Sequence, residues 1–188
     1  MSWNNNILPQ NFYNRNPVTV AQELLGMYLV RKIGSEYLVG KIIETEAYLP
    51  KGDKAAHNFT GKTKRNASLY KTAGHVYIHA MRQYNLLDIV TEGQSRPGSV
   101  LIRALEPVEG VKIMKKFRNE SRIENLTNGP GKVCQAFKVN RDLDGMDITK
   151  VTSNLFIIKN TEITTKPVTI TERVGIVSEK NLPLRFTL

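Results

Sequence analysis

Short runs in which apolar and polar residues alternate predict a protein built mainly of β-strands. The runs cover residues 27–32, 37–47, 75–80, 84–91 and 99–105. The first two are separated by a turn around Gly34–Ser35, which is the pattern of a hairpin. From Leu155 onward, β-branched residues alternate with turn residues and predict further strands. Strands therefore dominate the expected fold.

Three segments predict helices. Thr19–Gln22 resembles a capping box, and Gly26 suits the position just after a short helix. Pro107–Asn119 predicts a second helix, because proline is favoured at the first helical position. The helix breaker Asn128–Gly131 precedes a third short helix over residues 132–137. Strands with a few helices indicate an α+β fold.

The chain of 188 residues shows no repeat and no linker, so we expect a single domain over residues 1–188. Its Asn-rich residues 1–16 are expected to form a loose N-terminal arm. Cys134 is the only cysteine, which excludes a disulfide framework and a thiolate metal cage. There is neither a signal peptide pattern nor an apolar run near the roughly 20 residues that span a bilayer. We expect a cytoplasmic protein, associated with the nucleoid if bacterial, that is not secreted and binds no membrane.

The chain is strongly basic, with 27 Lys and Arg residues against 17 Asp and Glu residues and a formal net charge of +10. Basic residues gather in residues 51–71, where Asp53 is the only acidic residue, and in residues 111–141. Clustered cations suit a surface that follows phosphates, because each neutralised phosphate releases counterions. A solvated helix face explains Lys112, Lys115 and Lys116 equally well.

Residues 42–57 carry the most chemistry. An apolar run leads into Glu44, Glu46 and Tyr48, which share one face of a strand because side chains alternate. His57 returns after a short polar loop. A carboxylate beside an aromatic ring and an imidazole could activate water next to a stacked flat ring.

Two interpretations of Glu46 remain open at this point. It is either a general base at the floor of a pocket, or a half-exposed strand residue beside Lys41 or Arg31.

A second strand places Tyr77 and His79 on one face, where they could close a stacking slot against Tyr48. The turn Met81–Gln83 follows, and then Tyr84. An exposed turn with large side chains is the kind of wedge that enters a base stack, although a plain hairpin tip fits equally.

Arg103 lies inside an apolar strand, so it is either functional or paired with Glu106. Gly129–Lys132 precedes a helix and exposes backbone N–H groups and a lysine, which suits a phosphate contact but lacks P-loop spacing. His75 and His79 are not spaced as a helical metal pair, so we expect no metal.

Several motifs occur in order along most of the chain. They are Leu24–Gly26, Ile43–Tyr48, Ala55–His57, Leu101–Pro107, Gly129–Lys132, Arg173–Gly175 and Pro183–Phe186. In this order the chain resembles the alkyladenine (3-methyladenine, methylpurine) DNA glycosylase family. The resemblance implies a curved, barrel-like antiparallel sheet with flanking helices and a β-hairpin that enters the minor groove. It also implies that a damaged nucleotide is flipped out of double-stranded DNA and its base is removed.

The resemblance implies a role for each matching residue. Glu46 would be catalytic and activate water for attack on the anomeric carbon. Tyr48 would stack on the base, and His57 would hydrogen-bond to it. Arg103 would support the flipped nucleotide, and Lys132 would contact the DNA backbone. No lysine is placed as a Schiff-base nucleophile, so we expect a monofunctional hydrolase. We also expect that it needs no cofactor. A single flipping pocket works in a monomer, which is the oligomeric state we expect.

Three departures from the family pattern are local. His79 stands where the family usually has a second tyrosine, and Asp88 sits close to a usual asparagine near the water. The hairpin tip has Met81–Tyr84 instead of a Tyr-Gly wedge. We expect Tyr77 and His79 to line the base pocket, Asp88 to lie near the catalytic water and Tyr84 to contact DNA. Our hypothesis is that Arg82 or Met81 fills the gap left by the flipped base.

Three functions follow from these observations. The first is excision of alkylated or deaminated purines of the 3-methyladenine, 7-methylguanine and hypoxanthine class. The second is a non-catalytic nucleic-acid-binding module on the same scaffold. The third is an RNA or ribosome-associated factor on a related barrel.

Overall fold

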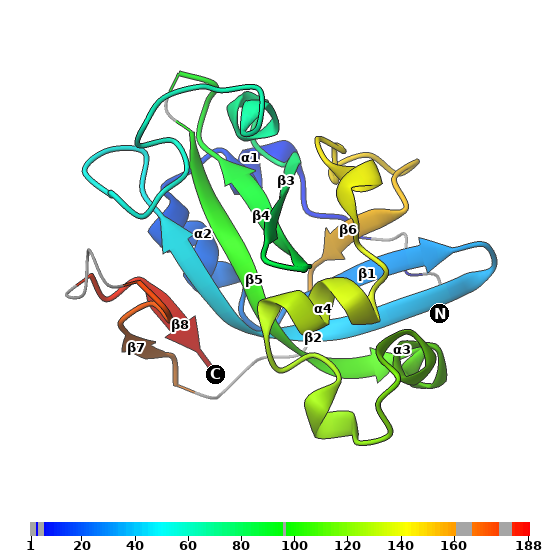
Figure 1. Cartoon of the computed structure of the whole chain (residues 1–188). Helices are drawn as coiled ribbons and strands as arrows, with labels where there is room; N and C mark the ends of the chain where they lie inside the picture. Colours follow the sequence, from blue (N-terminus) through cyan, green and yellow to red (C-terminus); the bar gives the residue numbers. More distant parts are fainter. Residues whose placement is uncertain (1–2, 4–5, 96, 161–166, 177–181) are drawn as a thin grey trace.

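In a computed structural model, which describes residues 3, 6–95, 97–160, 167–176 and 182–188, one antiparallel sheet curls into a half-barrel (Figure 1). The α+β class and the curved sheet are thereby confirmed. The main path runs in the order β3-β4-β5-β2-β1-β6, and β8 pairs with both β2 and β7. The strands are β1 (Tyr28–Ile33), β2 (Glu36–Tyr48), β3 (Val76–Met81), β4 (Tyr84–Thr91), β5 (Gly98–Glu109), β6 (Leu155–Ile158), β7 (Thr169–Thr171) and β8 (Arg185–Thr187).

The long strand β2 organises the sheet. It pairs with β1 and β5, and its C-terminal half also pairs with β8. The register against β5 shifts between Ile42 and Glu44 and again between Glu44 and Thr45. Such β-bulges bend a strand and re-aim its side chains. The bend therefore lies at the two carboxylates that the sequence singles out.

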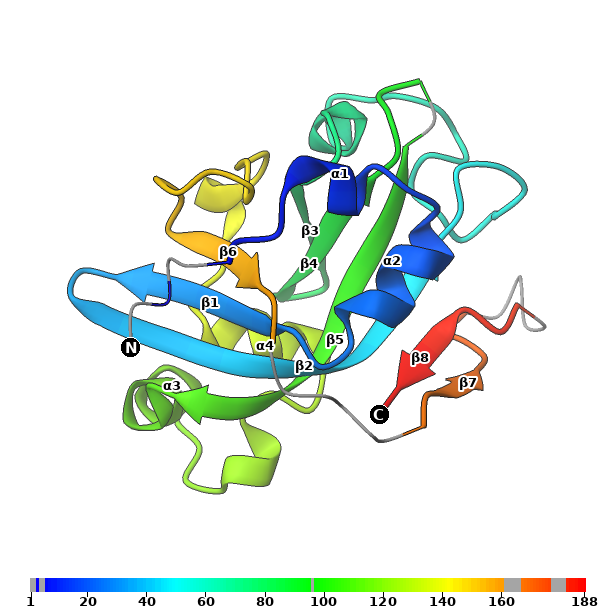
Figure 2. The same ribbon diagram turned by 180° about the vertical axis from the view of Figure 1, so that it is seen from behind.

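Four α-helices flank the sheet in the described residues: α1 (Gln10–Tyr13), α2 (Pro17–Leu24), α3 (Val111–Arg118) and α4 (Pro130–Ala136). Short 3-10 turns lie at Ala67–Tyr70, Ile123–Asn125 and Arg141–Leu143. Helix α2 packs on β2, where the hydroxyl of Thr45 donates to the carbonyl of Ala21 at 2.8 Å. Helix α4 packs against β4 and β5 (Figures 1 and 2). Between these elements lies one large apolar core.

Two predicted helix starts are wrong. Helix α2 begins at Pro17 and not after Thr19, because the side chain of Asn16 accepts a hydrogen bond from the Val18 N–H at 2.9 Å. Pro107 opens no helix but lies inside β5, opposite Gly40, and α3 starts only at Val111.

The glycine between β5 and α3 explains why helix α3 starts later than predicted. Gly110 has a φ of +76°, and a Cβ at that position would lie 2.5 Å from a side-chain carbon of Leu38. The chain thus turns sharply at Gly110, and strand pairing prevails over the helical preference of the proline up to Glu109.

The expectation of a loose arm is wrong for the described part of residues 1–16. Ile7 forms a bridge with Ile158, and Leu8 and Tyr13 are buried. Tyr13 belongs to helix α1 and to the main core. This segment is therefore part of the fold.

Candidate active site

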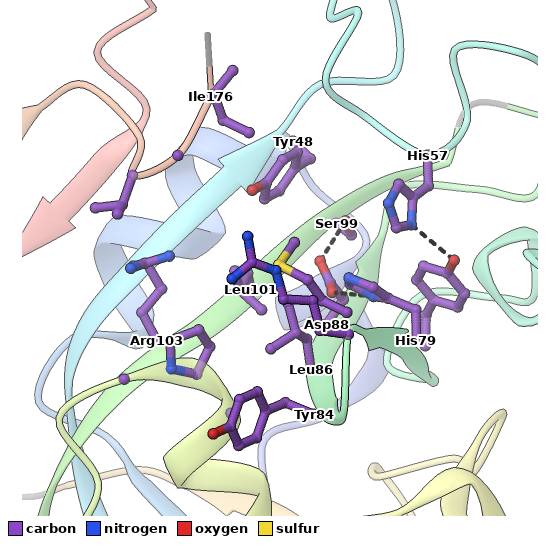
Figure 3. Close-up of a pocket in the computed structure, with 18 of the residues that line it drawn as sticks. Tyr48, His57, His79, Tyr84, Leu86, Asp88, Ser99, Leu101, Arg103 and Ile176 are labelled. Atoms are coloured by element: carbon purple, nitrogen blue, oxygen red, sulfur yellow. Dashed lines mark hydrogen bonds and ion pairs between the residues drawn. The ribbon is translucent and has the colours of Figure 1, made fainter.

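A pocket of about 650 Å³ opens between the β3–β4 hairpin, β5, the start of α4 and the segment around Val174 (Figure 3). Ten of the eleven residues predicted for the site line this pocket. They are Tyr48, His57, Tyr77, His79, Met81, Arg82, Tyr84, Asp88, Arg103 and Lys132. The exception is Glu46, which lies behind the wall. The fold thus gathers residues from positions 48 to 132 around one cavity.

Glu46 is fully buried, with no exposed surface. Its Oε1 accepts a hydrogen bond of 2.8 Å from the Val174 N–H and lies 3.3 Å from Nη1 of Arg103. Its Oε2 accepts a hydrogen bond of 3.0 Å from the Tyr48 hydroxyl. All three partners line the pocket. The carboxylate therefore lies directly behind the pocket wall, and the interpretation of a half-exposed strand residue is wrong.

Glu44 and Glu46 share one face of β2, as the alternation of side chains predicts, but their environments differ. Glu44 accepts hydrogen bonds from Nε of Arg103 at 2.7 Å and from Nε of Arg185 at 2.6 Å. Burial opposes ionisation, yet these two guanidinium groups outweigh it and the pKa of Glu44 lies below its ordinary value. The alternative pairing of Arg103 with Glu106 is wrong, because Arg103 bridges the two β2 carboxylates.

The pKa of Glu46 shifts in the opposite direction. Burial raises it, and the lowering effects of Arg103, the Val174 N–H and the Tyr48 hydroxyl do not cancel that rise. Two neighbouring carboxylates with separated pKa values are a common sign of divided roles. Glu44 is suited to remain an anion that holds arginines, and Glu46 is suited to exchange a proton.

A buried ion pair that the sequence did not reveal supports Tyr48. The guanidinium of Arg173 donates to both carboxylate oxygens of Asp53, at 2.7 and 2.8 Å, and lies 4.6 Å from the Tyr48 ring centre. The arginine holds the pKa of Asp53 low despite its burial, which alone would raise that pKa. Arg173 itself does not line the pocket, so it holds the ring from behind.

This pair also fixes the position of Val174, the next residue. Asp53 and Arg173 are 120 positions apart, and no local pattern connects them. A signal was nevertheless present, because Arg173 belongs to one of the motifs that carry the family resemblance.

Three rings form one wall of the pocket. The His57 and His79 rings are 4.4 Å apart, and Tyr77 stacks on His79 at 5.2 Å with a 24° angle between the planes. Nδ1 of His57 shares a hydrogen bond of 2.9 Å with the Tyr77 hydroxyl. Figure 3 shows Tyr48 and His57 on neighbouring sides of the cavity. A planar group could be held between these aromatic surfaces.

The hairpin tip between β3 and β4 projects large side chains beside the pocket. Met81 and Tyr84 are exposed by 56% and 37%, and Arg82 adopts a positive φ of +54°. The start of α4 packs against this tip, because a Cβ on Gly131 would lie 2.9 Å from Tyr84. Nearby, Nζ of Lys132 donates to the Asn128 side chain at 2.7 Å.

In the described residues, no group of three or more His, Cys, Asp and Glu side chains is arranged to hold a metal ion. None of the described helices combines the length and hydrophobicity that crossing a membrane requires.

Comparison with known proteins matches residues 11–188 to the family described as “Methylpurine-DNA glycosylase (MPG)”. Three similar proteins each carry the name “Putative 3-methyladenine DNA glycosylase”. The one from Carboxydothermus hydrogenoformans is 40% identical over 97% of this chain and 95% of its own. Those from Chlorobium phaeobacteroides and Methanoculleus marisnigri are 37% and 40% identical, over 95% and 96% of this chain and 91% and 94% of their own.

Proposed function

The chain belongs to the methylpurine-DNA glycosylase family, and on that basis we propose that it hydrolyses the N-glycosidic bond of damaged purines with water activated by Glu46. It is a DNA N-glycosylase, so its substrate is DNA. The proposed lesions are alkylated and deaminated purines of the 3-methyladenine, 7-methylguanine and hypoxanthine class. The proposed enzyme is monofunctional and leaves an abasic site.

The pocket supports extrusion of the target base. A base inside a duplex cannot be reached, so the nucleotide must be flipped out, at a cost of a few kcal/mol. The cavity of about 650 Å³ lies within the usual range for a small-molecule site and is walled by Tyr48, His57 and Tyr77. Stacking on these rings would repay part of the cost of unstacking in DNA. A damaged base pairs less well, so its extrusion from the duplex costs less free energy.

In the proposed reaction, water attacks the anomeric carbon of the extruded nucleotide. A new C–O bond forms as the C–N bond breaks, and the bonding electron pair leaves with the base. Glu46 takes the proton from the water, and as an anion it stabilises the oxocarbenium-like charge on the sugar. Its raised pKa makes it a stronger base than a solvated glutamate. A purine that carries an alkyl group and a positive charge leaves as a neutral base, so no acid is needed.

One observation carries this proposal: each hydrogen-bond partner of the buried Glu46 carboxylate lines the pocket. Among the described residues, its Oε2 accepts one hydrogen bond, from Tyr48, so one lone pair remains for water. Glu46 has no exposed surface, so water cannot reach it in this structure. When DNA binds, the side chains of the wall formed by Tyr48, Arg103 and Val174 must move apart far enough to admit one water molecule. Arg103 would then stay in place through Glu44 and face the sugar or its phosphate.

Cations around the cavity suit the DNA backbone. Arg82, Arg118 and Lys132 all line the pocket, on the hairpin, α3 and α4. Phosphate contacts of this kind position a protein on DNA without reading its sequence. The exposed hairpin tip would enter the minor groove, and Arg82 or Met81 would fill the space of the flipped base.

The proposed function can be tested with duplex oligonucleotides that each contain one lesion. After incubation, hot alkali cleaves the strand at any abasic site. We expect strand scission at 7-methylguanine or hypoxanthine with the unaltered protein and a loss of about 100-fold or more for Glu46→Gln. Glu36→Gln, which alters an exposed glutamate at the start of β2, is the matched control and should behave like the unaltered protein.

Retained binding to lesion DNA without scission by the unaltered protein would favour the non-catalytic module. Equal scission by the unaltered protein and by Glu46→Gln would remove Glu46 from the mechanism.

A further inference from the structure

A buried carboxylate and a buried imidazole face each other in the wall of the pocket. Asp88 and His79 are 3% and 7% exposed, and Oδ2 of Asp88 lies 3.3 Å from Nδ1 of His79. Within the part of the chain that the structure describes, neither of these two atoms has a hydrogen bond. The other oxygen of Asp88 accepts a hydrogen bond of 3.0 Å from the Ser99 hydroxyl. Figure 3 shows this group on the side of the cavity next to His57.

Asp88 differs from the other acidic residues around the site. Glu44, Glu46 and Asp53 each contact an arginine side chain. Asp88, the only acidic residue among the described residues that line the pocket, contacts an imidazole and a hydroxyl instead. A buried anion without a cation is costly. A positively charged ligand in the pocket would supply the missing counter-charge.

Asp88 and His79 are both ionisable and face each other across strands β3 and β4, within ion-pair distance. Asp88 thereby places a carboxylate in the wall of the pocket.

We propose that Asp88 provides the counter-charge for a cationic alkylated purine in the pocket. The protein would then favour positively charged lesions over neutral lesions of the same shape. This inference rests on the proposed function, because it concerns which extruded base the pocket accepts.

The direction of the effect follows from charge. A carboxylate in the wall of the pocket attracts a cationic base, whereas a neutral base of the same shape is little affected.

The test compares two lesions that differ by one charge. One is 7-methylguanine, with a 2′-fluorine on its sugar to prevent cleavage, and the other is 7-methyl-7-deazaguanine, its neutral isostere. Equilibrium affinity for duplexes with either lesion is measured at neutral pH. Because binding is measured without cleavage, a failure of catalysis cannot hide the result. Every protein is tested with the same DNA, so titration of the lesion itself cancels between proteins.

The expected result is that Asp88→Asn lowers the preference for the cationic lesion by about tenfold, or about 1.4 kcal/mol. His79→Gln, which keeps the carboxylate, should retain the preference. Asp142→Asn, at an exposed aspartate outside the pocket, should match the unaltered protein.

A preference that changes by less than about twofold in Asp88→Asn would overturn the proposal. If Asp88→Asn does not fold, the unaltered protein decides alone, because equal affinity for the cationic lesion and for its neutral isostere would also overturn the proposal.

Discussion

The backbone N–H of Val174 donates a hydrogen bond of 2.8 Å to the carboxylate of Glu46, across 128 positions of sequence. Strand β2 supplies the carboxylate, β5 supplies Arg103, and the segment after β7 supplies the third contact. The site is therefore complete only when the C-terminal part of the chain has packed on β2. This arrangement also sets the proton affinity of Glu46, since each of these contacts lowers a pKa that burial raises.

The rate of base excision should depend on pH through Glu46. The carboxylate must be ionised to accept a proton, so the rate should rise with pH through its raised pKa and then level off. Arg103→Gln removes the contact that lowers this pKa most, so the rising limb should move to higher pH and the plateau should fall. Single-turnover rates measured against pH provide the check. Arg15→Gln, which alters an arginine paired with Glu23 outside the pocket, is the matched control.

An unchanged midpoint in Arg103→Gln, whatever the height of the plateau, would contradict the assignment of Glu46 as the titrating group.

The Asp53–Arg173 pair should be important for stability. Both side chains are almost fully buried, and removal of one partner leaves the other as an uncompensated charge. Asp53→Asn should lower the free energy of unfolding by about 3 kcal/mol at neutral pH. Urea denaturation measures this difference, and Asp142→Asn is the exposed control.

The pH dependence of that difference has a definite sign. The folded pKa of Asp53 is lowered, so its contribution is complete above the unfolded pKa and is lost as the pH falls through the folded value. The difference in free energy of unfolding between the unaltered protein and Asp53→Asn should therefore disappear below about pH 4. A gap that stays constant into acid would show that the pair does not behave as an ion pair.

The sequence alone predicted most strands to within a few residues, because their apolar alternation is local. It also placed Glu44, Glu46 and Tyr48 on one face of the strand. The structure confirms this, because Arg103 contacts both carboxylates and the Tyr48 hydroxyl contacts that of Glu46. Ten residues expected at the site do line one pocket, although the roles proposed for them remain predictions.

The features that the sequence could not predict depend on distant partners. Pro107 continues a strand because Gly40 lies opposite it, and Asp53 is held by an arginine 120 positions away. The burial of Leu8 and Tyr13 depends on the core that they join. Local propensity contains none of this information.

The hairpin tip provides a test of how the extruded base is replaced. Arg82 lines the pocket, whereas its neighbour Gln83 does not. If Arg82 fills the gap in the duplex, Arg82→Ala should weaken binding to lesion DNA at least about fivefold, and Gln83→Ala should have little effect. Arg82→Met separates the effect of side-chain volume from that of charge. If the side chain acts by its volume, Arg82→Met should keep most of the affinity for lesion DNA, and only the salt dependence of that affinity should decrease. Full affinity and full rate in Arg82→Ala would remove the hypothesis.

The contact between α4 and the hairpin should control the position of the hairpin. A Cβ on Gly131 would lie 2.9 Å from both Cβ and Cγ of Tyr84, so one of them must move. Alanine gains up to about 1 kcal/mol over glycine in a helix, and overpacking costs about 1–3 kcal/mol. Tyr84 is 37% exposed at the end of its strand, so the hairpin can shift and limit the loss of stability.

We therefore expect Gly131→Ala to change the free energy of unfolding by less than about 1 kcal/mol. We expect the same variant to slow base excision by tenfold or more, because a small displacement of groups at a reacting centre lowers the rate strongly. Gly93→Ala is the matched control. Gly93 is exposed and lies outside the pocket, and a Cβ at this position would meet no atom within 4 Å. Denaturation curves and single-turnover rates on the same preparations separate the two effects. Equal rates in the two variants would show that the hairpin does not need α4 to hold it beside the pocket.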